Sequence, residues 1–144
     1  MTVFDGMQIE EIVCVYMEYG DDFLECIEAA IREKEIETGA VLSGIGTFDS
    51  ATVHYITHTG FPPKDKMVTI EGPVELCSVD GIIADGKPHL HCTMALRGER
   101  CLAGHLEPGC RVLYLAEAVI AKFSGRALTR DTHPEHGTGR LTQA

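Results

Sequence analysis

Two histidines separated by one residue stand in the segment 87–93, Lys-Pro-His-Leu-His-Cys-Thr. Alternate residues of a β-strand project to the same face, so we expect the rings of His89 and His91 to lie side by side. A neutral imidazole is the commonest metal-binding side chain near neutral pH. The pair therefore predicts part of a chelating site for a divalent metal ion.

A third histidine, His105, stands on the strand that is expected to return after the next turn. A two-residue turn at Gly98-Glu99 would pair His105 with Cys92 and direct its ring to the opposite face. A three-residue loop, or a one-residue bulge near Gly104, would set it opposite Thr93 and on the same face as the other two histidines. The metal hypothesis requires this second arrangement.

Three histidine donors with an open fourth position are typical of zinc sites that bind water or substrate, whereas closed structural sites usually include cysteines. Iron, nickel or cobalt would suit the same donors, so zinc is the default. The alternative interpretation of His-x-His is a hydrogen-bonded polar face without an ion.

The four remaining histidines give weaker signals. His54 and His58 have the i, i+4 spacing of a metal pair on a helix, but their stretch has the pattern of a strand. His133 and His136 lie in a polar C-terminal segment, where we expect them to be solvated.

Glu117 interrupts the otherwise apolar stretch 111–123. A carboxylate there has to be ion-paired, hydrated or placed at a subunit contact. It is also a candidate for a carboxylate that hydrogen-bonds to a metal-binding histidine, or for a general base. The glycine-rich segment 43–46 lacks the third glycine of a dinucleotide loop and the lysine of a P-loop, so we interpret it as a close approach of two backbones.

Charge and cysteine content restrict the classes of protein to which this chain can belong. A formal net charge of −10 argues against direct nucleic-acid binding, which depends on neutralising phosphates. The six cysteines form no Cys-x-x-Cys pair, so we predict small buried hydrophobic side chains rather than disulfides or zinc ligands. The first residues do not resemble a signal peptide, and no apolar run is long enough to span a bilayer, which predicts a cytoplasmic protein without membrane contact.

The pattern of elements predicts an α+β fold: a single domain over residues 1–123 with a mostly antiparallel or mixed central sheet and one main helix packed on it. The apolar stretch 9–17 predicts a largely buried first strand. The pair Asp21-Asp22 is expected to supply the N-cap of an amphipathic helix that ends at Thr38-Gly39. Turn signals such as Asp85-Gly86 separate the later strands, six to eight in all. Residues 124–144 lose the hydrophobic pattern and are expected to form a flexible tail.

Several segments together resemble the PPC ("plants and prokaryotes conserved") domain, over roughly residues 11–123. These segments are 40–48 (Ala-Val-Leu-Ser-Gly-Ile-Gly-Thr-Phe), 71–81 (Glu-Gly-Pro-Val-Glu-Leu-Cys-Ser-Val-Asp-Gly), 86–91 (Gly-Lys-Pro-His-Leu-His) and 104–106 (Gly-His-Leu). Several spaced motifs in agreement are more specific than any one of them. The resemblance implies an α+β fold, a homotrimer and, as in prokaryotic members, a metal held by His89, His91 and His105.

Plant members of the PPC family carry an AT-hook for DNA, and this chain has no such segment. Their partner-contact motif corresponds to a stretch that lacks its arginine here, Gly72, Pro73, Val74, Glu75 and Leu76. The leading hypothesis is thus a homotrimeric metal-binding protein with a binding or regulatory role. The alternatives are a metalloenzyme that acts on a small substrate at the open metal position, and a DNA-associated protein that acts through partners.

Overall fold

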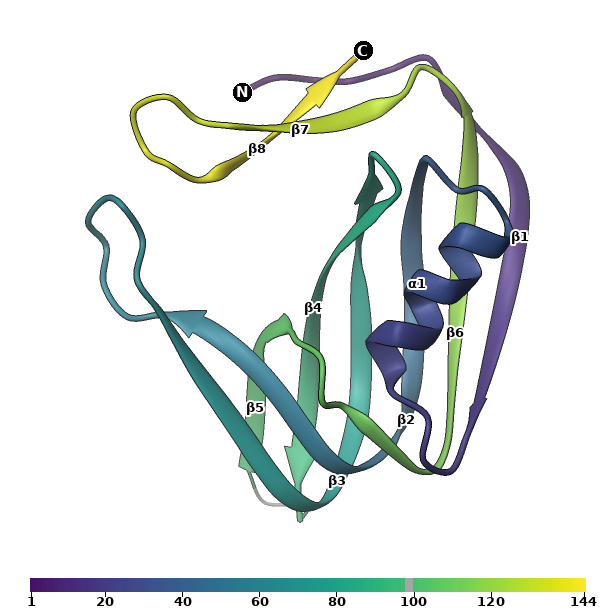
Figure 1. The fold of residues 1–144 in the computed structure, drawn as a ribbon, viewed down its shortest axis with the longest axis vertical. Helices are drawn as coiled ribbons and strands as arrows, with labels where there is room; N and C mark the ends of the chain where they lie inside the picture. The colour runs from purple at the N-terminus through teal and green to yellow at the C-terminus, as the bar shows by residue number, and fades with distance from the viewer. Residues whose placement is uncertain (98–99) are drawn as a thin grey trace.

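Eight strands and one helix make up the part of the chain that the structure, a computed structural model, describes, which is residues 1–97 and 100–144 (Figure 1). They follow in the order β1 (Met7–Glu18), α1 (Phe23–Glu33), β2 (Thr38–Ile56), β3 (Asp65–Ala84), β4 (Lys87–Leu96), β5 (Arg100–Leu106), β6 (Arg111–Gly125), β7 (Leu128–Thr132) and β8 (Gly139–Gln143). Strands dominate, so the predicted α+β class holds in a coarse sense, as a single domain with a large sheet and one helix of 11 residues. Among the described residues, no helix has the length and apolarity that crossing a membrane would require.

Six strands form one antiparallel sheet in the order β1-β6-β2-β3-β4-β5. The long strand β2 also pairs with β5, through Val53–Leu106 and His54–His105, and this pairing closes β2, β3, β4 and β5 into a ring. The close approach of β5 to β2 depends on Gly104, because a Cβ atom at this position would lie 2.5 Å from the carbonyl oxygen of His54. The ring brings the end of β2 beside the two strands that carry the histidine motif.

The helix begins where the sequence predicts. Asp22 is its N-cap, and one carboxylate oxygen accepts hydrogen bonds from the backbone N–H groups of Leu24 and Glu25 at 3.0 and 3.2 Å. Phe23 is fully buried and meets the equally buried Phe48 of β2 edge to face, with ring centroids 5.8 Å apart. This contact joins the first turn of α1 to the centre of the sheet, which is where the hydrophobic core lies.

The predicted end of the helix is wrong by several residues. The helix ends at Glu33, and Glu35 rather than a glycine takes the left-handed conformation, with φ of 51°. Gly39 belongs to β2, where a Cβ atom would lie 2.5 Å from the carbonyl oxygen of Ala121. This glycine serves close strand packing and not a helix cap.

The burial predicted for β1 and for the cysteines is only partly correct. Within β1, Val13 and Met17 are buried, whereas most of its other side chains are exposed, because one face of this edge strand packs on the core. All six cysteines are free; Cys92 and Cys110 are buried, but three of the others lie on exposed strand faces, Cys14, Cys77 and Cys101. Apolar composition identified the strands, but it did not tell which face each residue occupies.

In the C-terminal segment, β6 ends at Gly125, and a β-hairpin that the sequence did not indicate follows it. Strands β7 and β8 pair from Leu128–Gln143 to Thr132–Gly139. The N–H of Leu128, which is 4% exposed, donates to the hydroxyl of Thr38, and its carbonyl accepts from the N–H of Asp85. The hairpin therefore lies against the main sheet, next to the turn between β3 and β4 (Figure 1).

Candidate metal centre

The rings of His89, His91 and His105 meet on one face of the β4–β5 pair. One nitrogen of each histidine lies within 4.8 Å of one nitrogen of each of the other two. The ring centroids are 5.4 Å apart for His89–His91, 4.9 Å for His89–His105 and 5.5 Å for His91–His105. A single ion placed between the three nitrogens could bind all of them.

The strand register that produces this cluster differs from the predicted one. His105 pairs with His91, not with Thr93, in a ladder that runs from Leu96–Arg100 without a shift. The bulge near Gly104, which was one of the two arrangements considered, does not occur. Positions 91 and 93 share a strand face, so the predicted orientation of His105 is retained. The predicted turn at Gly98-Glu99 lies outside the described residues.

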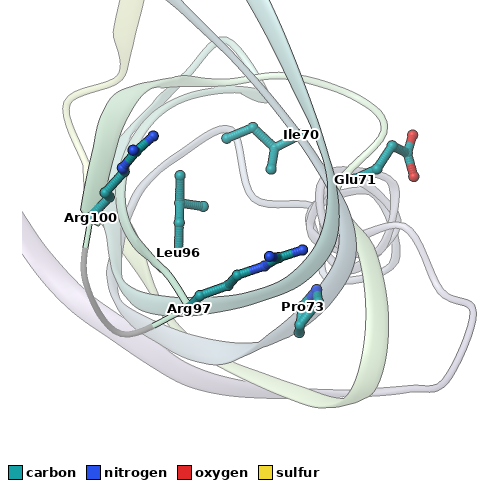
Figure 2. Close-up of a pocket in the computed structure, with 6 residues that line it drawn as sticks. All are labelled: Ile70, Glu71, Pro73, Leu96, Arg97 and Arg100. Atoms are coloured by element: carbon teal, nitrogen blue, oxygen red, sulfur yellow. The ribbon is translucent and has the colours of Figure 1, made fainter.

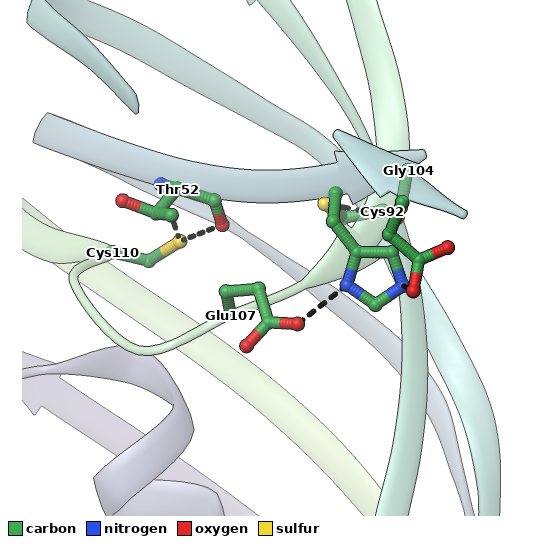
Figure 3. A network of polar contacts seen from close by, with 7 residues as sticks. Thr52, Cys92, Gly104, Glu107 and Cys110 are labelled. Atoms are coloured by element: carbon green, nitrogen blue, oxygen red, sulfur yellow. Dashed lines mark hydrogen bonds and ion pairs between the residues drawn. The ribbon is translucent and has the colours of Figure 1, made fainter. Parts of the chain in front are cut away.

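A second group of donors adjoins the first and was not predicted. The His54 ring stacks on His105, with centroids 4.5 Å apart. The Glu107 carboxylate contacts Nδ1 of His54, and Figure 3 shows Glu107 joined by a dashed line to an imidazole nitrogen. His54, His105 and Glu107 also bring one donor atom each within 4.8 Å of one another. His105 therefore belongs to both groups.

Burial and neighbouring charges favour the neutral, metal-binding form of two of these histidines, His89 and His105. Burial lowers the pKa of His89 to about 4, and nearby positive charges, including that of Arg130, act in the same direction. The pKa of His105 is also lowered, first by burial and then by His54, whereas Glu107 and Asp65 oppose this shift. Neutral imidazole leaves a nitrogen lone pair free for an ion.

Glu117 lies elsewhere. It is exposed on β6, where it pairs with Tyr16 of β1 and Ile45 of β2, and neither donor group includes it. A carboxylate that does lie near the cluster is that of Glu107, within 4.8 Å of a nitrogen of His105. Cys92 is directed away as well, because its buried thiol donates to the carbonyl of Gly104, and burial raises its pKa to about 12.

The segment from Gly72 to Leu76 lies within β3, which continues through it without a break. Val74 and Leu76 are buried, whereas Pro73 and Glu75 are exposed. Pro73 lines a hollow of about 420 Å³ together with the side chains of Ile70, Glu71, Leu96, Arg97 and Arg100 (Figure 2). This hollow shares no lining residue with the histidine cluster.

Residues 5–124 match the Plants and Prokaryotes Conserved (PCC) domain. The chain belongs to this family. The match confirms the resemblance to the PPC domain that the sequence motifs indicated, and its boundaries stop just before the β7–β8 hairpin.

Solved structures share the fold of this PCC domain over nearly its whole length. A metal-containing protein from Archaeoglobus fulgidus is 23% identical, with a TM-score of 0.82 and 99% of each chain covered. A plant- and prokaryote-conserved protein from Pyrococcus horikoshii is 22% identical, with the same TM-score and coverage. A hypothetical protein from Salmonella is 18% identical, with a TM-score of 0.81 and 93% of each chain covered. At these identities the likeness establishes the fold.

Curated relatives also include longer proteins. Two proteins from Synechococcus strains, each named bifunctional protein GlmU, are 29% and 28% identical to this chain over 118 residues. The matched region covers 82% of this chain and 18% of each relative. The chain therefore spans less than a fifth of the length of these relatives.

Proposed function

We propose that this PCC-family protein binds a divalent metal ion, zinc by default, through His89, His91 and His105. The observation that carries this proposal is the convergence of three imidazole nitrogens from two adjacent strands within 4.8 Å of one another. A structural neighbour from Archaeoglobus fulgidus is described as a metal-containing protein, which agrees with the proposal.

The residues present fit such an ion. All three donors are imidazoles, and the residues His89 and His91 are covered only in part, so an ion can reach them. The lowered pKa of His89 and of His105 favours the neutral form of both. Three histidines leave a further coordination position for water or a small molecule. A bound ion would supply Lewis acidity there, and the three side chains would hold and orient it.

Metal analysis of single-residue variants tests this assignment against the second donor group. Purified wild-type protein, His91→Ala and Glu107→Gln are loaded with zinc, freed of excess ion and measured by elemental analysis. We expect His91→Ala to lose zinc affinity by about 100-fold or more, because loss of a ligand should exceed the roughly 10–100-fold effect of losing a residue that only hydrogen-bonds to a ligand. Glu107→Gln should retain the ion at a stoichiometry close to that of wild type.

His58→Ala is the matched control, since it removes an exposed histidine from the connection between β2 and β3. If His91→Ala binds zinc as tightly as this control while Glu107→Gln loses it, the ion belongs to the His54–His105–Glu107 group instead. If no variant differs from wild type, the histidine cluster is not the metal site.

We further propose that the chain forms a homotrimer through the outer face of β1, β6 and β2. Large apolar side chains are exposed in this region, with exposed fractions of 61% for Tyr16, 51% for Ile45 and 41% for Leu115. Tyr16 and Ile45 flank Glu117 in one cross-strand row. An exposed apolar patch of this kind is typical of a surface that another subunit covers. Glu117 within it would then require a polar or positively charged partner from the other subunit.

Light scattering on the purified protein tests the assembly. We expect a mass about three times the 15.7 kDa of the chain. Ile45→Glu places a charge in the proposed contact and should shift the protein towards monomer, whereas Val3→Glu, at an exposed apolar residue near the N-terminus, should not. A monomeric wild-type protein, or an Ile45→Glu variant of unchanged mass, would contradict this proposal.

The cellular role that suits this site best is binding or regulation, and one observation favours a metalloenzyme as the second candidate. The contact between Glu107 and Nδ1 of His54 places a carboxylate–histidine pair against His105. A carboxylate that holds a histidine in one orientation is the usual companion of a metal-bound or proton-transferring imidazole. Zinc-dependent turnover of a small substrate that is lost in Glu107→Gln, with zinc content unchanged, would decide for the enzyme.

A further inference from the structure

Arg130 of β7 is partly buried, and within the described residues its buried Nε atom has no hydrogen-bond partner. Two other arginines of the chain form short ion pairs. Arg140 forms a two-pronged contact with Asp131 at 2.9 and 2.6 Å, and Arg111 donates to Asp49 at 2.7 Å. In the part of the chain that the structure describes, Arg130 takes part in no such ion pair. Its guanidinium is therefore partly desolvated without a compensating anion.

The fold places this guanidinium near the histidine cluster. The hydrogen bond from Asp85 to the carbonyl of Leu128 fixes the start of β7 next to the turn that leads into β4. Arg130 is two residues further along β7 and so projects to the same side of the strand as Leu128, while His89 is the third residue of β4. The positive charge of Arg130 is close enough to contribute to the lowered pKa of His89.

Charges of opposite sign act on the two ends of the cluster. At the His105 end, the Glu107 carboxylate lies within 4.8 Å of a nitrogen of His105, and Asp65 lies 4.0 Å from Nε2 of the stacked His54. At the His89 end, the start of β7 is held beside the turn into β4, and this strand carries Arg130. A ligand at the cluster would thus meet carboxylates on one side and an unpaired guanidinium on the other.

A partly buried guanidinium without an anion is unfavourable, and its fork of N–H donors matches the two oxygens of a carboxylate or phosphate. We propose that Arg130 anchors a small oxyanion, the carboxylate or phosphate group of a small-molecule ligand, at the His89 end of the cluster. The inference rests on the proposed metal site, since it assigns a ligand class to the open position beside that ion. The β7–β8 hairpin then forms one wall of the ligand site.

Calorimetric titration tests the anchor. Inorganic phosphate and, separately, acetate are titrated into zinc-loaded wild-type protein, Arg130→Gln and the control Arg126→Gln. Arg126 is an exposed arginine on the same segment, 3.9 Å from Asp5. We expect the dissociation constant of both anions to rise about tenfold or more in Arg130→Gln and to stay unchanged in Arg126→Gln, with zinc content the same in all three. The anion that binds more tightly to wild type identifies which of the two groups the site prefers.

A second measurement uses wild-type protein alone, so its outcome does not depend on whether a variant folds. Phosphate should slow the modification of Arg130 by phenylglyoxal in the zinc-loaded wild-type protein, as measured by peptide mass spectrometry, and should leave that of Arg126 unchanged. Equal anion affinity in wild type and Arg130→Gln, or no saturable binding by the zinc-loaded wild type, overturns the anchor and leaves the metal site standing. If the protein binds no zinc, the proposed metal site is wrong. The anion titrations are then made on metal-free wild type and Arg130→Gln, and equal affinity in the two overturns the role of Arg130.

Discussion

Zinc-loaded wild-type protein is expected to hold about one ion per chain, and His105→Ala is expected to hold almost none. His105 is the residue that the two donor groups share, so its removal leaves either group with two donors. Whichever group holds the ion, zinc affinity should therefore fall by about 100-fold or more. This exceeds the effect of removing a residue that only hydrogen-bonds to a ligand. Competition with a zinc-sensitive dye measures it directly.

Thermal unfolding provides an independent readout of the same variant. A ligand that binds the folded state raises its stability in proportion to the logarithm of its concentration over Kd. Added zinc should therefore raise the Tm of wild type and of the control His58→Ala, and leave the Tm of His105→Ala unchanged. A His105→Ala protein that retains full zinc affinity would place the ion outside the cluster altogether.

Phe48→Ala should lower the free energy of unfolding by about 3–5 kcal/mol. Phe48 is fully buried in the middle of β2 and meets Phe23 at the start of α1. The substitution removes a large apolar surface and leaves a cavity at the junction of helix and sheet, where neighbouring strands restrict relaxation. Urea unfolding monitored by circular dichroism measures the loss, at a fixed protein concentration because subunit association would contribute to stability.

Phe61→Ala makes the same chemical change at a side chain that is 63% exposed, in the connection between β2 and β3. Its effect should stay within about 0.5 kcal/mol, as for most exposed positions. Equal losses in the two variants would mean that the contact between Phe23 and Phe48 does not hold the helix on the sheet.

The start of the helix and the face of the histidine motif could be predicted because both depend on neighbouring residues. Asp22 lies directly before the apolar periodicity of α1 and caps it as expected. His89 and His91 share a face because strand alternation requires it. The partner of His105 was predicted wrongly, as Thr93 instead of His91, because it depends on the number of residues in the turn that joins β4 and β5.

The second donor group could not be found from local patterns. His54 and Glu107 are 53 residues apart in the chain and meet because the end of β2 pairs with β5. Hydrophobic periodicity does not indicate that a strand such as β2, already paired with β3 and β6, bends to pair with β5 as well. The one available signal was Gly104, which we interpreted as a bulge and which instead permits the two backbones to approach.

The hairpin of β7 and β8 was missed for a different reason. Its cross-strand contacts are polar, as between Thr129 and Thr142 or Asp131 and Arg140. Hydrophobic alternation, the main signal for a strand, is therefore weak in this segment, although Leu128 anchors it to the domain. The residue on which our ligand inference depends, Arg130, lies in this part of the chain.

The pairing of β2 with β5 makes position 104 a diagnostic marker for comparing relatives of this domain. A side chain there would collide with the backbone of His54 and push the two strands apart. His54 would then leave His105, while the pairing of His91 with His105 across β4 and β5 could persist. Relatives that lack a glycine at this position should thus keep the three-histidine set without its carboxylate neighbour, and a sequence alone would suffice to sort them.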